Sequence, residues 1–171
     1  MTSWSWYAAS VELLAREPTA GERILVEAIA TLRGTTNREW LATNLALLGE
    51  ALYLQGRYAE SLAVSTEALA TARADYLYAA SPASRVRAKS LAQTGSTDDA
   101  ESVVLDAISR LEKTDALGER ARTFAAASEI FALAGSDERS RVHRDKALEL
   151  FDEKGDVVSG AALAESARHA R

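Results

Sequence analysis

The sequence contains no cysteine, two prolines and only 6% aromatic residues in 171 positions. Without cysteine the chain forms neither disulfides nor thiolate sites for metals or catalysis. With so little proline, helices can run almost uninterrupted, because an interior proline removes a hydrogen bond and clashes with the preceding turn. No apolar run approaches the roughly 20 residues that a membrane span requires. We therefore expect a cytoplasmic chain that does not enter a membrane.

An excess of basic residues is also missing. Lysine and arginine total 20 against 25 acidic residues, which gives a net charge of −5. A surface that binds nucleic-acid phosphates needs positive charge, so we expect no direct contact with nucleic acid. The remaining composition is rich in Ala, Leu, Glu and Arg, which favour helices because they lose little rotamer freedom there. The sequence predicts an all-α fold in a single domain over residues 1–171.

Small residues recur along the chain with a fixed period. An alanine followed by an aliphatic residue occurs at Ala28, Ala68, Ala107 and Ala147, with spacings of 40, 39 and 40 residues. Such a period is typical of helical hairpins that stack because no single unit can bury its apolar face. We predict an α-α superhelix of about four helical hairpins and a C-terminal capping helix. The predicted units are approximately 3–34, 36–74, 75–113 and 115–154, and the capping helix covers 157–170.

Two further columns of small residues fall into register with these alanines. Seven residues before each alanine stand Gly21, Ser61, Ala100 and Ser140. Nineteen residues before each alanine stand Ala9, Gly49, Ala88 and Ser128. Small side chains at matching positions allow the two helices of a hairpin to approach closely. The turns inside the hairpins are expected near Arg16, Gly56, Gly95 and Gly135, since glycine readily adopts the left-handed conformation that ends a helix.

These signals predict nine helices, at about 4–16, 20–33, 37–55, 58–73, 76–94, 97–113, 116–134, 137–154 and 157–170. Pro82 falls inside the fifth helix, so we expect a kink there, or a break with Ser81 capping a shorter helix. Thr19 and Thr36 each precede a glutamate by three residues. This spacing is typical of a capping box and predicts that both threonines cap helices.

The second unit, NLALLGEALYLQGRYAESLAVSTEALATA, resembles a tetratricopeptide (TPR) repeat. The matching positions are Leu48-Gly49, Leu52, Gly56-Arg57-Tyr58, Ser61 and Ala68-Leu69. The third and fourth units match more weakly and the first unit is the most divergent. The stretch RDKALELFDEKGDVVSGAALAES also resembles the long-period version of this repeat that is found in many bacterial regulators. The resemblance implies a right-handed superhelix whose concave groove, lined by the first helix of each hairpin, binds a protein or peptide segment.

The resemblance also places candidate binding residues on the first helices. These candidates are Trp6, Ser10, Glu50, Tyr53, Arg85, Lys89, Arg122 and Glu129. Arg85 and Lys89 lie one helical turn apart, so both side chains can meet one carboxylate of a ligand. An acidic peptide or a chain terminus would suit this pair. A solvated charged face without a ligand is the alternative interpretation.

Aromatic residues gather at two other places. Trp4, Trp6 and Tyr7 are interpreted as a ligand-facing patch or, alternatively, as rings that seal the first hairpin or a dimer contact. Tyr76 and Tyr78 are interpreted as packing between units or as a second exposed aromatic site.

No set of residues points to catalysis. The two histidines, His143 and His169, lie far apart in sequence and are expected to be exposed, and no glycine-rich phosphate loop is present. We therefore expect no enzymatic activity, no cofactor and no metal. The leading hypothesis is a protein-binding scaffold. The alternatives are the sensing or oligomerisation domain of a bacterial transcription regulator whose DNA-binding part is elsewhere, and a structural homodimer.

Overall fold

The computed structural model describes residues 4–73 and 75–169, with side chains placed up to residue 165 in the last helix. This part of the chain contains nine α-helices, close to the predicted positions, and no strand. The helices are α1 (Ser5–Leu14), α2 (Pro18–Leu32), α3 (Arg38–Leu54), α4 (Tyr58–Thr71), α5 (Leu77–Gln93), α6 (Thr97–Leu111), α7 (Leu117–Leu133), α8 (Asp137–Lys154) and α9 (Val157–His169).

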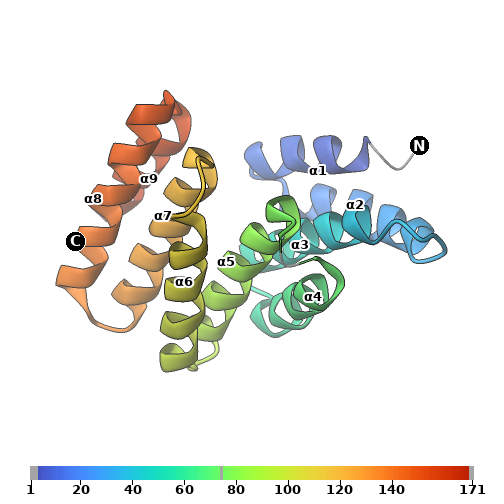
Figure 1. The fold of residues 1–171 in the computed structure, drawn as a ribbon, viewed down its shortest axis with the longest axis horizontal. Helices are drawn as coiled ribbons and strands as arrows, with labels where there is room; N and C mark the ends of the chain where they lie inside the picture. Colours follow the sequence, from blue (N-terminus) through green and yellow to red (C-terminus); the bar gives the residue numbers. More distant parts are fainter. Residues whose placement is uncertain (1–3, 74, 170–171) are drawn as a thin grey trace.

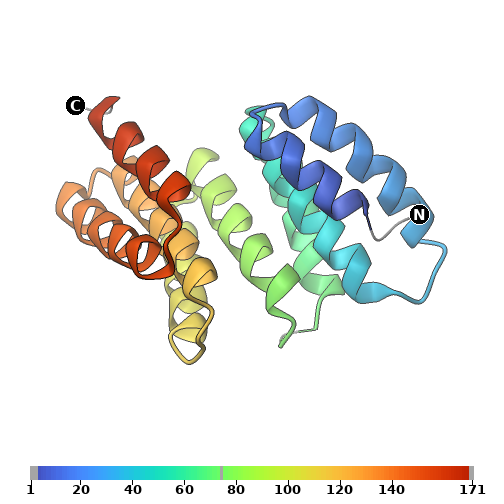
Figure 2. The ribbon, with the colours of Figure 1, turned by 90° about the horizontal axis from the view of Figure 1, so that it is seen from above.

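Consecutive helices pack as antiparallel hairpins, and the hairpins stack along the long axis of the molecule. Figures 1 and 2 show this progression from the blue α1–α2 pair to the red α8–α9 pair, with the two ends of the chain at opposite ends of the stack. The first helices touch one another, since α1 contacts α3, α3 contacts α5, and α5 contacts α7. Among the described residues, the second helices α2, α4, α6 and α8 make no comparable contacts with one another. The first helices therefore form the closely packed inner layer of the stack.

The repeated small residues are the positions where the helices meet. All twelve members of the three columns are buried. At Gly49, an added Cβ would lie 3.2 Å from Cγ1 of Val86, closer than an ordinary van der Waals contact, so a larger residue would have to displace the Val86 side chain. The serines of one column also hydrogen-bond across their hairpins: Ser61 donates to the Gly49 carbonyl at 2.7 Å, and Ser140 to the Ser128 carbonyl at 2.8 Å.

The predicted turns inside the hairpins adopt the left-handed conformation. Gly56, Gly95 and Gly135 have φ angles of 75°, 87° and 69°, and Arg16 occupies the same conformation with a φ of 62°. A side chain in this region costs roughly 1–2 kcal/mol, because Cβ approaches the following carbonyl oxygen. The first hairpin thus keeps the turn geometry of the others without the glycine that favours it.

Three groups of apolar side chains form the core. One joins α1 to α5, the second joins α5 to α7, and the third joins α7 to α9. Phe131 belongs to the second group and is completely buried. Leu163 of α9 packs against the third group, so α9 covers the last hairpin. None of the helices in the described residues is both long and apolar enough to cross a membrane.

Three local predictions are wrong. Helix α5 continues from Leu77 through Pro82, so the expected alternative of a break with Ser81 as the cap is wrong; only the carbonyl of the exposed residue Tyr78 loses its partner there. Helix α2 begins at Pro18 rather than after Thr19, since proline suits the first helical position. Helix α3 is capped by Asn37, whose side chain accepts a hydrogen bond from the Trp40 amide at 3.2 Å, and not by Thr36.

Candidate functional site

Six of the eight predicted binding residues lie on three neighbouring first helices. Glu50 and Tyr53 come from α3, Arg85 and Lys89 from α5, and Arg122 and Glu129 from α7. We call this group of six the first-helix wall. The residues on each helix are three, four or seven positions apart, so they share one helical face. Contacts between α3, α5 and α7 bring the three faces together.

Lys89 is the centre of the wall. Its side chain is only 13% exposed, and its Nζ atom lies 3.7 Å from Oε1 of Glu50 and 3.4 Å from Oε2 of Glu129. The ammonium also lies 4.0 Å from the centre of the Tyr53 ring, within the range of a cation–π interaction. The Tyr53 hydroxyl donates a hydrogen bond to Glu129 and accepts one from Nε2 of Gln93 at 3.2 Å. One buried cation is therefore held by two carboxylates and an aromatic ring.

The surroundings keep Lys89 and Tyr53 in their usual protonation states at neutral pH. Burial alone would lower the pKa of Lys89, but the charges of Glu50 and Glu129 outweigh it and raise the pKa above its usual value. Burial, together with the neighbouring Glu129 carboxylate, raises the pKa of Tyr53. Lys89 is thus charged and Tyr53 neutral, so the hydroxyl remains a hydrogen-bond donor.

A second cluster surrounds Glu119 at the other end of the wall. Arg85 pairs with Glu119 at 2.5 Å, and Ser81 donates a hydrogen bond to the same carboxylate at 2.9 Å. Arg122 lies 3.3 Å from Glu119 and 3.5 Å from Asp156. Arg85 and Lys89, which the sequence suggested for a ligand carboxylate, thus pair with carboxylates of the protein itself. Arg122 has the longer contacts and a 44% exposed side chain, so it is the more accessible cation.

The Glu119 carboxylate makes protein stability depend on pH. Burial acts to raise its pKa, but the charge of Arg85 and the hydrogen bonds lower it below the usual value of 4.5. A carboxyl with a lowered folded-state pKa stabilises the protein above its unfolded-state pKa, and this contribution disappears as the pH falls through the folded value. Glu119→Gln should therefore reduce the free energy of unfolding at pH 7, and the difference from the native protein should shrink below about pH 4.5.

Urea titrations at pH 7 and pH 3 measure this difference. Glu112→Gln, at an exposed position, is the matched control and should change little at either pH. A deficit of Glu119→Gln that is equal at both pH values would contradict the role of the ionised carboxylate.

The two predicted residues on α1 lie apart from the first-helix wall. Ser10 donates its hydroxyl hydrogen to the backbone carbonyl of Trp6 at 2.8 Å, and the Trp6 ring packs edge-on against Tyr7 at 4.3 Å. Both residues are half-buried. Within the described residues, no hydrogen bond, ion pair or ring contact joins either of them to the wall.

Four residues of the site were not among the sequence candidates. Ser81, Gln93 and Glu119 lie three or four positions from Arg85, Lys89 and Arg122, so helical spacing could have identified them. Ser81, Gln93 and Glu119 belong to no recognisable binding motif, so nothing besides this spacing distinguishes them in the sequence. Asp156 precedes α9 and accepts a hydrogen bond from the Ser159 amide at 3.1 Å. Its approach to Arg122 depends on how α9 packs, which no local pattern predicts.

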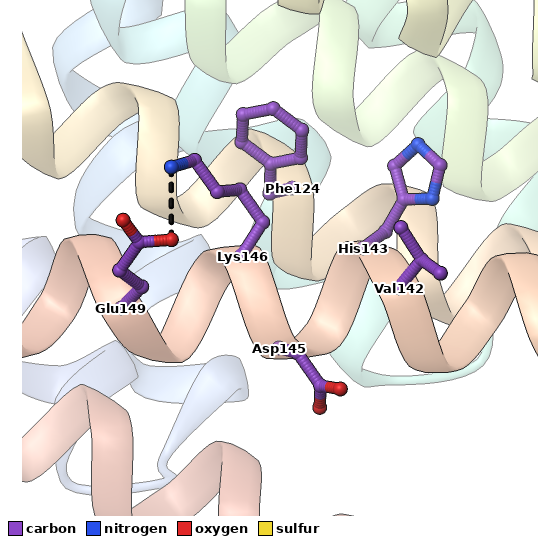
Figure 3. A pocket seen from close by; sticks show the side chains of 6 residues that line it. All are labelled: Phe124, Val142, His143, Asp145, Lys146 and Glu149. Carbon is purple, nitrogen blue, oxygen red and sulfur yellow. Dashed lines mark hydrogen bonds and ion pairs between the residues drawn. The ribbon is translucent and has the colours of Figure 1, made fainter.

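A shallow pocket of about 420 Å³ lies elsewhere, against α8. Figure 3 shows Phe124 of α7 on one side of α8, whereas Asp145 points away on the opposite side. Lys146 pairs with Glu149 at 2.9 Å along the helix surface. The polar groups do not converge on one point, as the groups of a ligand site usually do, so we do not assign this pocket a function.

His143 also borders this pocket. It is half-buried rather than exposed, because its ring packs 4.6 Å from that of Phe131. The side chain of His169 lies outside the described residues. Within those residues, no group of three potential metal-binding side chains lies together.

Known structures with a similar arrangement of helices are TPR-like repeat proteins. BtubC (BKLC) from P. vanneervenii matches with a TM-score of 0.64 and 14% identity, over 95% of this chain and 76% of that one. A putative kinesin light chain from Podosopora anserina with nearly identical TPR-like repeats matches with a TM-score of 0.59 and 12% identity, over 90% of this chain and 76% of that one. No family model and no curated protein matches the sequence. The structural likeness confirms the predicted all-α superhelix and the resemblance to TPR-like repeats.

Proposed function

Since the chain has the fold of TPR-like repeat proteins, a scaffold typically used for protein–protein interaction, we propose that its first-helix wall binds a segment of a partner protein. The role is non-enzymatic, and the partner is a cytoplasmic protein or peptide. The observation that carries the proposal is the convergence of six predicted residues from α3, α5 and α7. Charged and aromatic side chains that differ between units meet on one face, whereas the repeated small residues are buried where the helices pack.

The pairing within the wall indicates which residue meets the partner. Arg85 and Lys89 are both 13% exposed and hold protein carboxylates, so a ligand would have to displace these. Arg122 is more exposed, and its two contacts are longer than those of Arg85. We therefore place an acidic side chain or the C-terminal carboxylate of the partner segment on Arg122. A guanidinium can bind such a group with two parallel hydrogen bonds.

Peptides selected from a random display library against the immobilised protein provide the test. Their dissociation constants for Arg122→Ala should be about tenfold higher than for the native protein, since loss of one such contact costs roughly 1.4 kcal/mol. Calorimetric titration measures this change, and the selected peptides should be enriched in acidic residues or require a free C-terminus.

Arg110→Ala is the matched control. Arg110 pairs with Asp106 on α6, one of the second helices, and its side chain is 64% exposed. Its removal should leave peptide binding unchanged. An equal loss of peptide affinity in both variants would contradict the assignment of the first-helix wall. So would peptides whose binding is weakened only by substitutions outside the wall.

The oligomerisation domain of a bacterial transcription regulator is a second candidate function. One observation favours it: α1 exposes large apolar side chains, as an oligomerisation surface does. This proposal predicts that affinity capture with this protein recovers a DNA-binding protein, or that a DNA-binding part is encoded in the same reading frame. Partners without any DNA-binding part would contradict it.

A further inference from the structure

Helix α1 exposes a largely apolar face at one end of the stack. The exposed residues from its N-cap to its C-cap are Trp4, Tyr7, Ala8, Val11, Leu14 and Ala15. The one charged residue inside α1, Glu12, is half-buried and lies at the edge of this face, four residues after Ala8. The four large side chains are spaced by three, four and three residues, so they form one stripe along the helix. No neighbouring helix of the described chain covers this stripe, as the exposure of its members shows.

The size of the stripe matches the apolar part of a protein interface. Trp4, Tyr7, Val11 and Leu14 are 75%, 55%, 63% and 80% exposed. With about 150–250 Å² for an aromatic side chain and roughly 100 Å² for an aliphatic one, they expose about 340–470 Å² together. A stable interface covers about 800 Å² on each partner, of which slightly more than half, roughly 450 Å², is apolar. The stripe therefore supplies about the apolar area that one side of a dimer requires.

The order of residues in the stripe makes it complementary to itself. When two copies of α1 lie antiparallel around a twofold axis near residue 9, Trp4 faces Leu14 of the second copy, and Tyr7 faces its Val11. Each aromatic ring then contacts an aliphatic side chain of the second copy, and no aromatic ring faces its own equivalent across the twofold axis. The exposed alanines, Ala8 and Ala15, border the stripe and allow the helix backbones to approach closely. Such reciprocal contact is what a twofold interface requires.

We propose that this face of α1 binds the same face of a second copy, so that the protein is a twofold homodimer joined through antiparallel α1 helices. The inference does not depend on the first-helix wall, whose residues lie on α3, α5 and α7. Substitutions in α1 should therefore change association without changing peptide binding.

Val11→Asp tests the interface, because an unpaired carboxylate in its centre opposes burial. Sedimentation over a concentration series should show a dimer for the native protein and at least a roughly tenfold higher dissociation constant for Val11→Asp. Circular dichroism checks that the helices remain intact, as expected for a substitution at an exposed position. Val158→Asp, at the other end of the stack, is the matched control, since Val158 is 72% exposed on α9. It should sediment like the native protein.

The absence of native cysteine permits a second test of the register. Equal amounts of Tyr7→Cys and Val11→Cys should form more mixed disulfide-linked dimers than either variant forms alone, because positions 7 and 11 face each other across the axis. A native protein that remains monomeric at all concentrations overturns the proposal. So does a dimer that Val158→Asp breaks and Val11→Asp does not. Preferential linkage of the Tyr7→Cys variant to a Val158→Cys variant would replace the twofold dimer by head-to-tail association.

Discussion

Phe131→Ala is expected to lower the free energy of unfolding by about 3–5 kcal/mol. Phe131 is completely buried in the core between α5 and α7, and its removal leaves a cavity that the surrounding helices fill only in part. It also removes two contacts on the ring: Arg139 lies 3.8 Å from its centre and His143 lies 4.6 Å away. The melting temperature should fall by roughly 6–20 °C for a domain of this size.

Chemical denaturation followed by circular dichroism measures this loss. Leu133→Ala, two residues along the same helix, is the matched control because Leu133 is about half exposed. It should cost less than about 1 kcal/mol, since only part of its side chain leaves water on folding. Comparable losses in both variants would contradict the burial of Phe131 in the core.

Lys89→Met is expected to cost about 2–3 kcal/mol. The substitution keeps most of the side-chain volume but leaves Glu50 and Glu129 facing each other without the cation between them. Removing one partner of a fully buried ion pair costs about 3–5 kcal/mol. The value is smaller here because the side chains of Glu50 and Glu129 are 32% and 40% exposed and water screens their charges in part.

The triple variant Lys89→Met, Glu50→Gln, Glu129→Gln separates charge from shape. It removes the repulsion and keeps similar side-chain volumes, so it should recover most of the stability lost in Lys89→Met. Urea titration of both variants at pH 7 provides the comparison. Two variants of equal stability would show that Lys89 contributes by packing and not by pairing with the two carboxylates.

Helix positions and hairpin turns were predictable from the sequence because local chemistry determines them. The small residues and glycines mark places where two backbones approach or where φ is positive, and these requirements recur in every unit. The residues that signal the start of a helix predicted its first position less reliably. Thr36 and Asn37 both cap well, and the choice between neighbouring candidates depends on where the preceding chain enters the helix. The helix does not break at Pro82 because, near the start of α5, the proline costs one hydrogen bond, with an exposed residue as the unpaired acceptor.

For the candidate site, helical spacing together with the TPR-like resemblance was sufficient to choose the residues but not their partners. Lys89 and Glu129 belong to different units, 40 residues apart in the sequence, and their distance depends on the angle at which α5 and α7 pack. The sequence left Arg85 either facing a ligand carboxylate or solvated, whereas the tertiary structure supplies Glu119 as its partner. Trp6 and Ser10 share the predicted face of a first helix, yet α1 does not join them to the wall.

The sequence by itself determined the all-α repeat, its period of about 40 residues, the small residues at the helix crossings and the turns between helices. These follow from backbone conformation and side-chain size, which act over short distances along the chain. Only the tertiary structure decided that Lys89 is held by Glu50 and Glu129, that Arg122 is the most exposed cation of the first-helix wall, and that α1 leaves an apolar face uncovered. Each of these depends on which helices stack against one another, and pairing of charges or burial of a face is a property of that stacking rather than of any single segment.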